Sequence, residues 1–432
     1  MPLSMNETQR LMDLVTARRA RLIEIVASLV RIPSENKPPH GAELRVQQFI
    51  ADTLAAAGWN ARLYQPDLVP GVKEHPVFWP GRDYRDRPNL VACKSGAGGG
   101  RSLILSGHID TVPRGTQDWT RDAFGGEVEG NRLYGRGSND MKAGIATSLF
   151  VLEMLNEMGT TLRGDLTFET IVDEEFGGSN GTLAGRLAGY NADGAVITEP
   201  SFLRVCPAQR GGRTVHVTLR APGGVLSDAG MPSGVVDALR YFLVRLQDFA
   251  AQRRAFASIH ELYSHTPDPV PVSVTKIYTG PWGFDEPMTI PETCRVEMYW
   301  QTMPGETCDQ VDAEFLTWLR RAVDDAPSLF PVEPQVEWPI RWLPASFTPK
   351  NHPLVKEMSA AAVAVLGQSP VIAGIEGPCD MYLFHQFGVP AILWGPKGGN
   401  THAADEYVEI DTVVAAAQAL LVFVSEWCGV AD

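Results

Sequence analysis

Apolar and polar positions along the first 200 residues alternate between short runs typical of strands and longer stretches typical of helices. The strand-like runs are NLVAC (89–93), SLILSGHID (102–110), DLTFETIVDEE (165–175) and GAVITEP (194–200). Apolar residues at helical spacing occupy residues 11–30, after Asn6 as an N-cap, and residues 42–57 and 141–158. This alternation predicts an α/β fold with a mostly parallel central sheet and helices on both faces.

The pattern changes after Pro200, where RTVHVTLR (213–220) alternates like a half-exposed strand. Helical spacing then appears at residues 235–252 and 307–323, with two more strand-like runs between them. Two helices over an antiparallel sheet predict a small α+β domain at residues 212–325. We expect it to be inserted into a larger domain of residues 1–211 and 326–432, in which helical spacing resumes at residues 355–366 and 412–427.

Composition narrows the possible partners. The 432 residues are 44% hydrophobic, enough for more than one core, and the net charge of −14 argues against nucleic acid as a partner. The beginning of the chain lacks a basic segment followed by an apolar one, and no run of about 18 apolar residues stands out. We therefore expect a cytoplasmic protein with a small-molecule substrate and no membrane partner. The scattered cysteines predict free thiols.

Candidate catalytic side chains follow the predicted strands. His108 and Asp110 come just after an apolar run, and open α/β sheets bind ligands at the carboxyl ends of their strands. Two residues apart on an extended chain, the two side chains point to the same side. Asp110 can therefore hold one ring nitrogen of His108 while the other binds a metal ion. A lone His-x-Asp pair, however, is weak evidence.

Four further segments each have an ordinary structural explanation. Asp140, in LYGRGSNDMKAG, fits an N-cap, and the adjacent Glu174 and Glu175 fit surface charge. Glu199 ends the run VITEP, and His402 lies in the glycine-rich loop GPKGGNTHAADEYV. Taken together with His108, they place two histidines and four carboxylates at strand ends or in the following loops, which is difficult to explain structurally.

These ordered motifs resemble the two-metal amidohydrolases that include aminoacylase, acetylornithine deacetylase, succinyl-diaminopimelate desuccinylase and carboxypeptidase G, over nearly the whole chain. The resemblance implies a zinc-aminopeptidase-like fold whose inserted domain serves as a lid and dimerisation surface. It implies that one metal ion is bound by His108, Asp140 and Glu199, and a second by Asp140, Glu175 and His402. Glu174 would then be the general base, Asp110 the partner of His108, and the peptide bond after Asp140 would be cis.

The resemblance implies a hydrolase that cleaves a carbon–nitrogen bond with water activated by two divalent ions. Mixed imidazole and carboxylate ligands suit zinc, manganese or cobalt. A homodimer or higher homo-oligomer is expected through the inserted domain.

The inserted domain departs from the family pattern at three positions. Asp228 in LSDAG stands where relatives have a histidine that polarises the scissile carbonyl. Met288 replaces an asparagine, and Gln301 replaces an arginine. Other side chains of this region are candidates to compensate: Gln209, Arg210, Arg213 and His216. The expected substrate-binding set consists of Gln209, Arg210, His216, Asp228 and Gln301.

Several functions remain open. A deacylase or amidohydrolase acting on a small carboxylated substrate is the first expectation. The altered lid also suits hydrolytic deamination of an activated aromatic amine, as in a nitroanthranilate aminohydrolase. A non-catalytic binding protein with the same fold is disfavoured by the presence of Glu174, which is not needed as a ligand. A peptidase of large proteins is disfavoured because lid closure favours small substrates.

Overall fold

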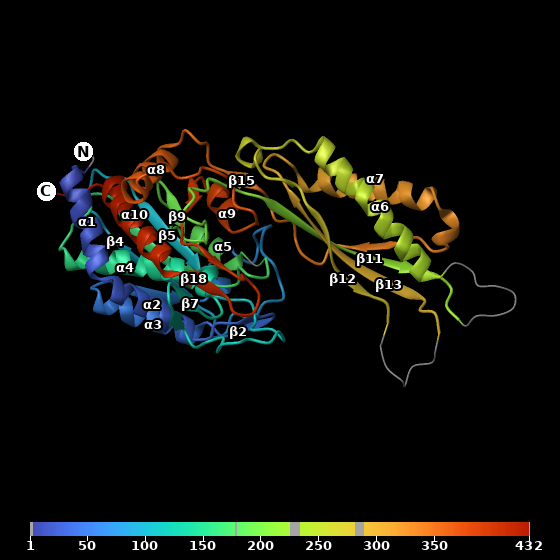
Figure 1. Cartoon of the computed structure of the whole chain (residues 1–432), viewed down its shortest axis with the longest axis horizontal. Helices are drawn as coiled ribbons and strands as arrows, with labels where there is room; N and C mark the ends of the chain where they lie inside the picture. The colour runs from blue at the N-terminus through green and yellow to red at the C-terminus, as the bar shows by residue number, and fades with distance from the viewer. Residues whose placement is uncertain (1–2, 178, 225–233, 281–288, 432) are drawn as a thin grey trace. The chain divides into compact units, whose positions relative to one another are not determined.

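The computed structural model describes residues 3–177, 179–224, 234–280 and 289–431 (Figure 1). The chain forms two compact units. The larger consists of Met1–Ala208, Phe347–Ile375 and Cys379–Asp432, and the smaller of Gln209–Ser346 and Glu376–Pro378. The smaller unit extends beyond the segment 212–325 that the sequence suggests, because β14 (Gln335–Glu337) pairs with β11 (Gly211–Arg220).

A six-stranded sheet forms the centre of the larger unit, with strand order β16-β9-β5-β8-β4-β3. Its strands are β3 (Ala61–Tyr64), β4 (Asn89–Lys94), β5 (Leu103–His108), β8 (Leu166–Ile171), β9 (Ala195–Ile197) and β16 (Ala391–Leu393). The four strands from β16 to β8 are parallel, whereas β4 and β3 are antiparallel to their neighbours. The predicted α/β class with a mostly parallel sheet is confirmed.

Helices cover both faces of this sheet. Gly107 of β5 faces α4 (Ala143–Glu157), since a Cβ there would meet Met141 and Ile145. The preceding residue, Ser106, faces the other way and donates a hydrogen bond to Glu169. Glu169 is paired with Arg186 of α5 (Asn180–Leu187) on that opposite face. The remaining helices of the unit are α1 (Met5–Ala17), α2 (Arg19–Arg31), α3 (Leu44–Ala56), α8 (Pro353–Leu366), α9 (Met381–Gln386) and α10 (Ile410–Cys428).

The first helical stretch differs from its prediction. The single pattern expected at residues 11–30 is divided between α1 and α2, which meet at Arg18. The N-cap of α1 is Ser4 rather than Asn6, because Ser4 and Glu7 form a reciprocal capping box.

Helix α10 is the one described helix that is long and apolar enough to cross a membrane by length and composition, although none was expected. Its 18-residue window is 72% buried in the larger unit. In Figure 1, α10 runs beside α4 and α8. Packing in the core accounts for its apolar composition.

A second, four-stranded sheet of the larger unit has the order β17-β18-β7-β6. Its strands are β6 (Glu127–Glu129), β7 (Arg132–Tyr134), β17 (Gly398–Gly399) and β18 (Tyr407–Glu409). Because β18 pairs with β7, the loop between β17 and β18 lies near the segment that follows β7. His402 belongs to the loop and Asp140 to the segment.

The smaller unit is an antiparallel sheet with two helices, α6 (Val235–Phe256) and α7 (Cys308–Asp324). The sheet order is β12-β13-β11-β14, with β12 at Val272–Tyr278 and β13 at Thr293–Thr302. Trp300 of β13 stacks on Phe315 of α7, with ring centroids 5.2 Å apart, and both are fully buried. Short elements complete the described chain: β1 (Asn36–Lys37), β2 (His40–Gly41), β10 (Ala208–Gln209), β15 (Ser346–Phe347), η1 (Pro66–Leu68), η3 (Glu261–Tyr263) and η4 (Pro327–Leu329).

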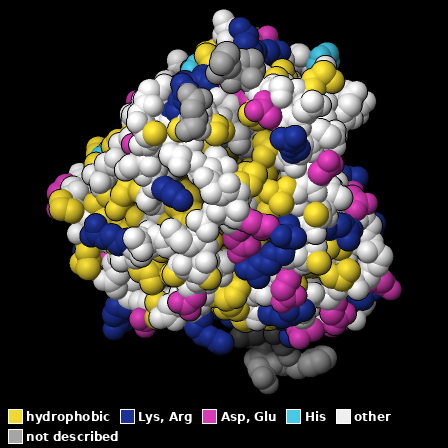
Figure 2. All heavy atoms as spheres, turned by 90° about the vertical axis from the view of Figure 1, so that its left-hand side faces the viewer, with side chains coloured by type: hydrophobic (Ala, Val, Ile, Leu, Met, Phe, Trp, Pro, Cys, Tyr) yellow, Lys and Arg dark blue, Asp and Glu magenta, His cyan; other side chains and the backbone are white. Residues whose placement is uncertain are grey.

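Charges of both signs are mixed on the molecular surface. Figure 2 shows Lys and Arg side chains interspersed with Asp and Glu and with apolar side chains over one face. Surface ion pairs such as Arg18 with Glu157 and Arg21 with Glu153 follow this arrangement. Such exposed pairs contribute little to stability.

Stability below neutral pH depends on His385 in this fold. Its Nε2 lies 3.0 Å from Oγ1 of Thr348 and accepts from the amide of Ala391, and burial lowers the pKa of His385 from 6.5 to about 4. Since the unfolded chain binds this proton more tightly, the free energy of unfolding falls as the pH drops from 6.5 towards 4. His385→Asn should remove up to about 3 kcal/mol of that fall, measured by urea unfolding across the window.

The control is His265→Asn, at an exposed histidine, unfolded in urea across the same pH window. If H385N and the wild type lose stability in parallel as the pH falls, His385 is not the responsible group.

Candidate metal centre

His108 is the last residue of β5 and is held by contacts on both sides of its ring. Nδ1 lies 2.9 Å from the main-chain carbonyl of Asp110, and Nε2 lies 3.1 Å from Oδ1 of Asp140. Oε1 of Glu199, just beyond β9, is 3.6 Å from the same Nε2. The ring is therefore oriented by the backbone and presents one nitrogen to two carboxylates.

The predicted role of Asp110 needs correction in its geometry. Its carboxylate is 3.7 Å from Nδ1 of His108, farther than its own carbonyl. The carboxylate instead accepts from the side-chain amide of Asn36 at 2.9 Å and from the backbone amides of Glu174 and Glu175 at 3.1 and 3.2 Å. Asp110 thus joins the histidine to the turn that carries both glutamates.

Asp140 lies in η2 (Ser138–Lys142), a short segment between β7 and α4. The backbone of Asp140 and Met141 has non-helical φ and ψ values. The peptide bond between these two residues is cis, as expected. Oδ1 of Asp140 faces His108, and Oδ2 lies 3.4 Å from Nε2 of His402. Asp140 therefore stands between the two histidines.

Glu174 and Glu175 lie in the turn after β8. Oε2 of Glu175 is 3.0 Å from Nε2 of His402, and its Oε1 accepts from the amide of Val112 at 3.1 Å. Oε2 of Glu174 is 4.0 Å from Nε2 of His108. Glu175 thus faces the second histidine, while Glu174 lies beside the first.

The donor atoms form two groups, each suited to one cation. His108, Asp140 and Glu199 form one, and Asp140, Glu175 and His402 form the other, with donor atoms in each group within 4.8 Å of one another. Asp140 is common to both groups, and Glu174 belongs to neither. Imidazole nitrogens with carboxylate oxygens fit zinc, manganese or cobalt, so the residues present suit two divalent ions.

Crowding of the carboxylates changes their acidity. Burial raises the pKa of Glu199 to about 8 and that of Glu174 well above its usual range. Burial opposes the charge of Asp140 as well, but hydrogen bonds from His108 and His402 hold its pKa low. Burial disfavours the charged form of His402, yet contacts with Asp140 and Glu175 raise its pKa to about 11. A centre with this much negative charge favours a cation.

A buried network that the sequence did not reveal holds the turn of the two glutamates. Asp173, which is fully buried and has φ 68°, accepts from the hydroxyl of Tyr84 at 2.6 Å and from Nε of Arg82 at 3.1 Å. The amide of Asn36 reaches both Asp173 and Asp110. The only signal in the sequence was an acidic residue directly before the glutamate pair.

The predicted substrate-binding residues of the smaller unit are engaged within that unit. Arg210 donates to the side-chain oxygen of Gln301, and the side-chain nitrogen of Gln301 donates to the carbonyl of Glu376 at 2.6 Å. Gln209 donates to the carbonyl of Pro344. Arg213 forms an ion pair with Asp312, and His216 lies 2.9 Å from Glu297. Asp228 and Met288 lie outside the described residues.

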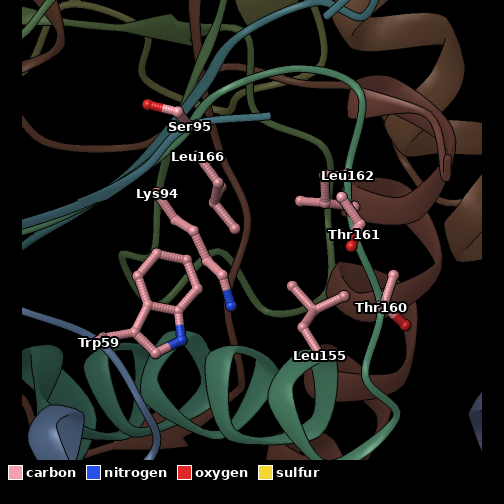
Figure 3. A pocket seen from close by; sticks show the side chains of 8 residues that line it. All are labelled: Trp59, Lys94, Ser95, Leu155, Thr160, Thr161, Leu162 and Leu166. Carbon is pink, nitrogen blue, oxygen red and sulfur yellow. The ribbon is translucent and has the colours of Figure 1, made fainter. Parts of the chain in front are cut away.

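A small cavity lies at the other end of the central strands. Lys94 and Leu166, which pair at that end of β4 and β8, line it with Trp59 and Leu155 (Figure 3). The ammonium of Lys94 lies 5.2 Å from the centroid of the Trp59 ring. The cavity has a volume of about 30 Å³, which holds roughly one water molecule. The cavity is therefore too small for a substrate.

The fold and the two donor groups are those of a metal-dependent hydrolase. The family model described as Peptidase family M20/M25/M40 matches residues 104–426. The chain belongs to this family, whose members hydrolyse carbon–nitrogen bonds.

Two curated relatives match the chain almost end to end. The N-formyl-4-amino-5-aminomethyl-2-methylpyrimidine deformylase of Bacillus subtilis (strain 168) is 25% identical over 440 residues, covering 96% of both chains. The acetylornithine deacetylase of Klebsiella pneumoniae (strain 342) is 26% identical over 414 residues, covering 94% of this chain and 97% of its own.

Solved structures show the same fold. The dipeptidase Dug1p of Saccharomyces cerevisiae has a TM-score of 0.75 at 13% identity, over 98% of this chain and 99% of its own. The Bacillus subtilis YXEP protein, described as a dinuclear metal binding peptidase, has a TM-score of 0.62 at 16% identity, over 96% and 99%.

The network around Asp173 leads to a prediction about stability. Tyr84→Phe removes one donor from a buried carboxylate and should lower the free energy of unfolding by about 1–3 kcal/mol. Urea unfolding of chelator-treated protein measures this change. Tyr190→Phe, at a partly buried tyrosine of the larger unit, is the matched control and should stay within about 0.5 kcal/mol of the wild type. Equal stability of Y84F and Y190F would show that the hydroxyl does not hold Asp173.

Proposed function

We propose that this chain hydrolyses the amide bond of a small N-acylated substrate, with two divalent cations in the two donor groups and Glu174 as general base. The observation that carries the proposal is the shared position of Asp140 between two groups, with Glu174 beside them and outside both. The name of the dinuclear relative supports the number of cations.

One cation would be held by His108, Asp140 and Glu199, and the other by Asp140, Glu175 and His402. When bound, two such cations supply Lewis acidity that acidifies water and polarises a carbonyl oxygen. The mixed ligand set discriminates little among zinc, manganese and cobalt, and we name zinc first because the family resemblance implies it.

Glu174 would carry the proton between the two halves of the reaction. Its carboxylate accepts a proton from the attacking water as the water oxygen bonds to the carbonyl carbon. It then donates that proton to the amide nitrogen as the carbon–nitrogen bond breaks, which yields a carboxylic acid and an amine.

The relatives support a small acyl group. The names of the two curated relatives describe removal of a formyl group from an aminomethylpyrimidine and of an acetyl group from ornithine. Both reactions free an amine from a short acyl group, so we propose an N-formyl or N-acetyl compound as the substrate class.

We further propose a homodimer or higher homo-oligomer through the smaller unit, and a cytoplasmic location. Strand β12 lies at the edge of its sheet and exposes Ile277 and Tyr278, as an interface would require. The six cysteines are free, which suits a reducing compartment: Cys93, Cys206, Cys294, Cys308, Cys379 and Cys428.

Glu174→Gln tests the proposed base. The change keeps the size of the side chain but removes the proton acceptor, so turnover should fall by about 10²–10⁴-fold. Metal content, measured by elemental analysis after gel filtration, should stay at the wild-type value because Glu174 belongs to neither donor group.

The matched control is Glu129→Gln, at an exposed glutamate paired with Arg121, and it should retain full activity. Full activity of E174Q would contradict the assignment of the base. Loss of metal from E174Q would show instead that Glu174 is a ligand.

A turnover screen followed by mass spectrometry tests the substrate class. Protein loaded with zinc or manganese is offered N-formyl and N-acetyl amines, dipeptides, ureido acids and aminobenzoates. Release of formate or acetate is the expected result, because the relatives act on short acyl groups. Ammonia released from an aminobenzoate, with the acyl compounds untouched, would contradict the proposal and favour aromatic deamination.

A further inference from the structure

We infer that Glu406 is a positioning residue that fixes Asp140 and His402 relative to each other. It lies four residues after His402, is 1% exposed, and is outside both donor groups. The inference rests on the proposed function, because the two donors it positions are proposed metal ligands.

The carboxylate of Glu406 collects the backbone amides that lead to Asp140. Oε1 accepts from the amide of Asn139 at 2.9 Å and from the amide of Asp140 itself at 3.1 Å. Oε2 accepts from the amide of Gly137 at 3.0 Å. Three hydrogen bonds to one rigid carboxylate fix the backbone from which the Asp140 side chain projects.

A buried cation pairs with this carboxylate and holds it in place. NH1 of Arg136 lies 2.5 Å from Oε2 of Glu406, and both side chains are almost fully buried. Arg136 also lies over the ring of Trp119, 5.2 Å from its centroid. Charge-assisted hydrogen bonds of this kind are stronger than neutral ones, so the anchor is stiff.

The same residue is part of the loop that carries His402. The carbonyl of Glu406 accepts from the amide of Gly135, and the side-chain amide of Asn139 donates to the hydroxyl of Thr401 at 2.7 Å. His402 has φ 62°, a left-handed value that is uncommon for residues other than glycine. Glu406 and the contact between Asn139 and Thr401 therefore join the two loops.

This arrangement predicts unequal effects on the two donor groups. The group of Asp140, Glu175 and His402 draws two donors from the joined loops, whereas the group with His108 and Glu199 draws only Asp140. Losing Glu406 should weaken cation binding in both groups. The effect should be larger in the group of Asp140, Glu175 and His402.

Calorimetric titration of chelator-treated protein with cobalt(II) tests the inference without any substrate. Glu406→Gln replaces one acceptor oxygen with a donor that faces backbone amides. One of the two binding events should lose about 10–100-fold in affinity, and the other less. Glu409→Gln is the matched control, because the side chain of Glu409 pairs with Lys397. The E409Q protein should bind cobalt as the wild type does.

A second variant covers the outcome in which E406Q does not fold, since that change leaves Arg136 without its carboxylate. Thr401→Val removes only the hydroxyl that accepts from Asn139, and it should weaken the same binding event by a smaller factor. Wild-type affinity in a folded E406Q, or in T401V where E406Q fails to fold, would overturn the inference.

The failure of the proposed function would look different. If the wild type itself binds a single cobalt ion, the two-cation proposal is wrong. Weakening of that single event in E406Q would still support the positioning role of Glu406, and an unchanged single event would overturn it.

Discussion

Mutual repulsion among buried carboxylates is the constraint on which the larger unit depends. Asp140, Glu174, Glu175 and Glu199 converge on two histidine rings at the carboxyl edge of the central sheet. Without compensation, such charges would push apart or take up protons, and burial does raise the pKa of the three glutamates. The scaffold must therefore hold these side chains where electrostatics alone would not leave them.

The scaffold meets much of this demand with hydrogen bonds to the backbone of the segments that carry the ligands. Asp110 accepts the amides of Glu174 and Glu175, while Glu406 accepts the amides before and at Asp140. Asp173 then holds the glutamate turn from the opposite side through Tyr84 and Arg82. The positions of these carboxylates are thus set by buried side chains that belong to neither donor group.

The parts of this structure that could be predicted are those with a local signature. The run before His108 has the apolar composition of a buried strand, so its place at the sheet edge follows from general rules. The anchoring role of Glu406 has no such signature, because its partners lie about 270 residues earlier and are backbone amides. The division of the first helical stretch at Arg18 was missed because apolar spacing continues through it. The orientation of the His108 ring by a main-chain carbonyl was also hidden, since every residue type has one.

The wide spacing of the donors along the chain has a consequence for folding. Asn139 and Thr401, which join the loops of Asp140 and His402, are 262 positions apart. The pairing of β18 with β7 is what brings these two loops together. Contacts between such distant segments form slowly, because a long loop must close before they gain any stability. The second donor group therefore reports that the tertiary structure of the larger unit has formed, which no single segment of it can do alone.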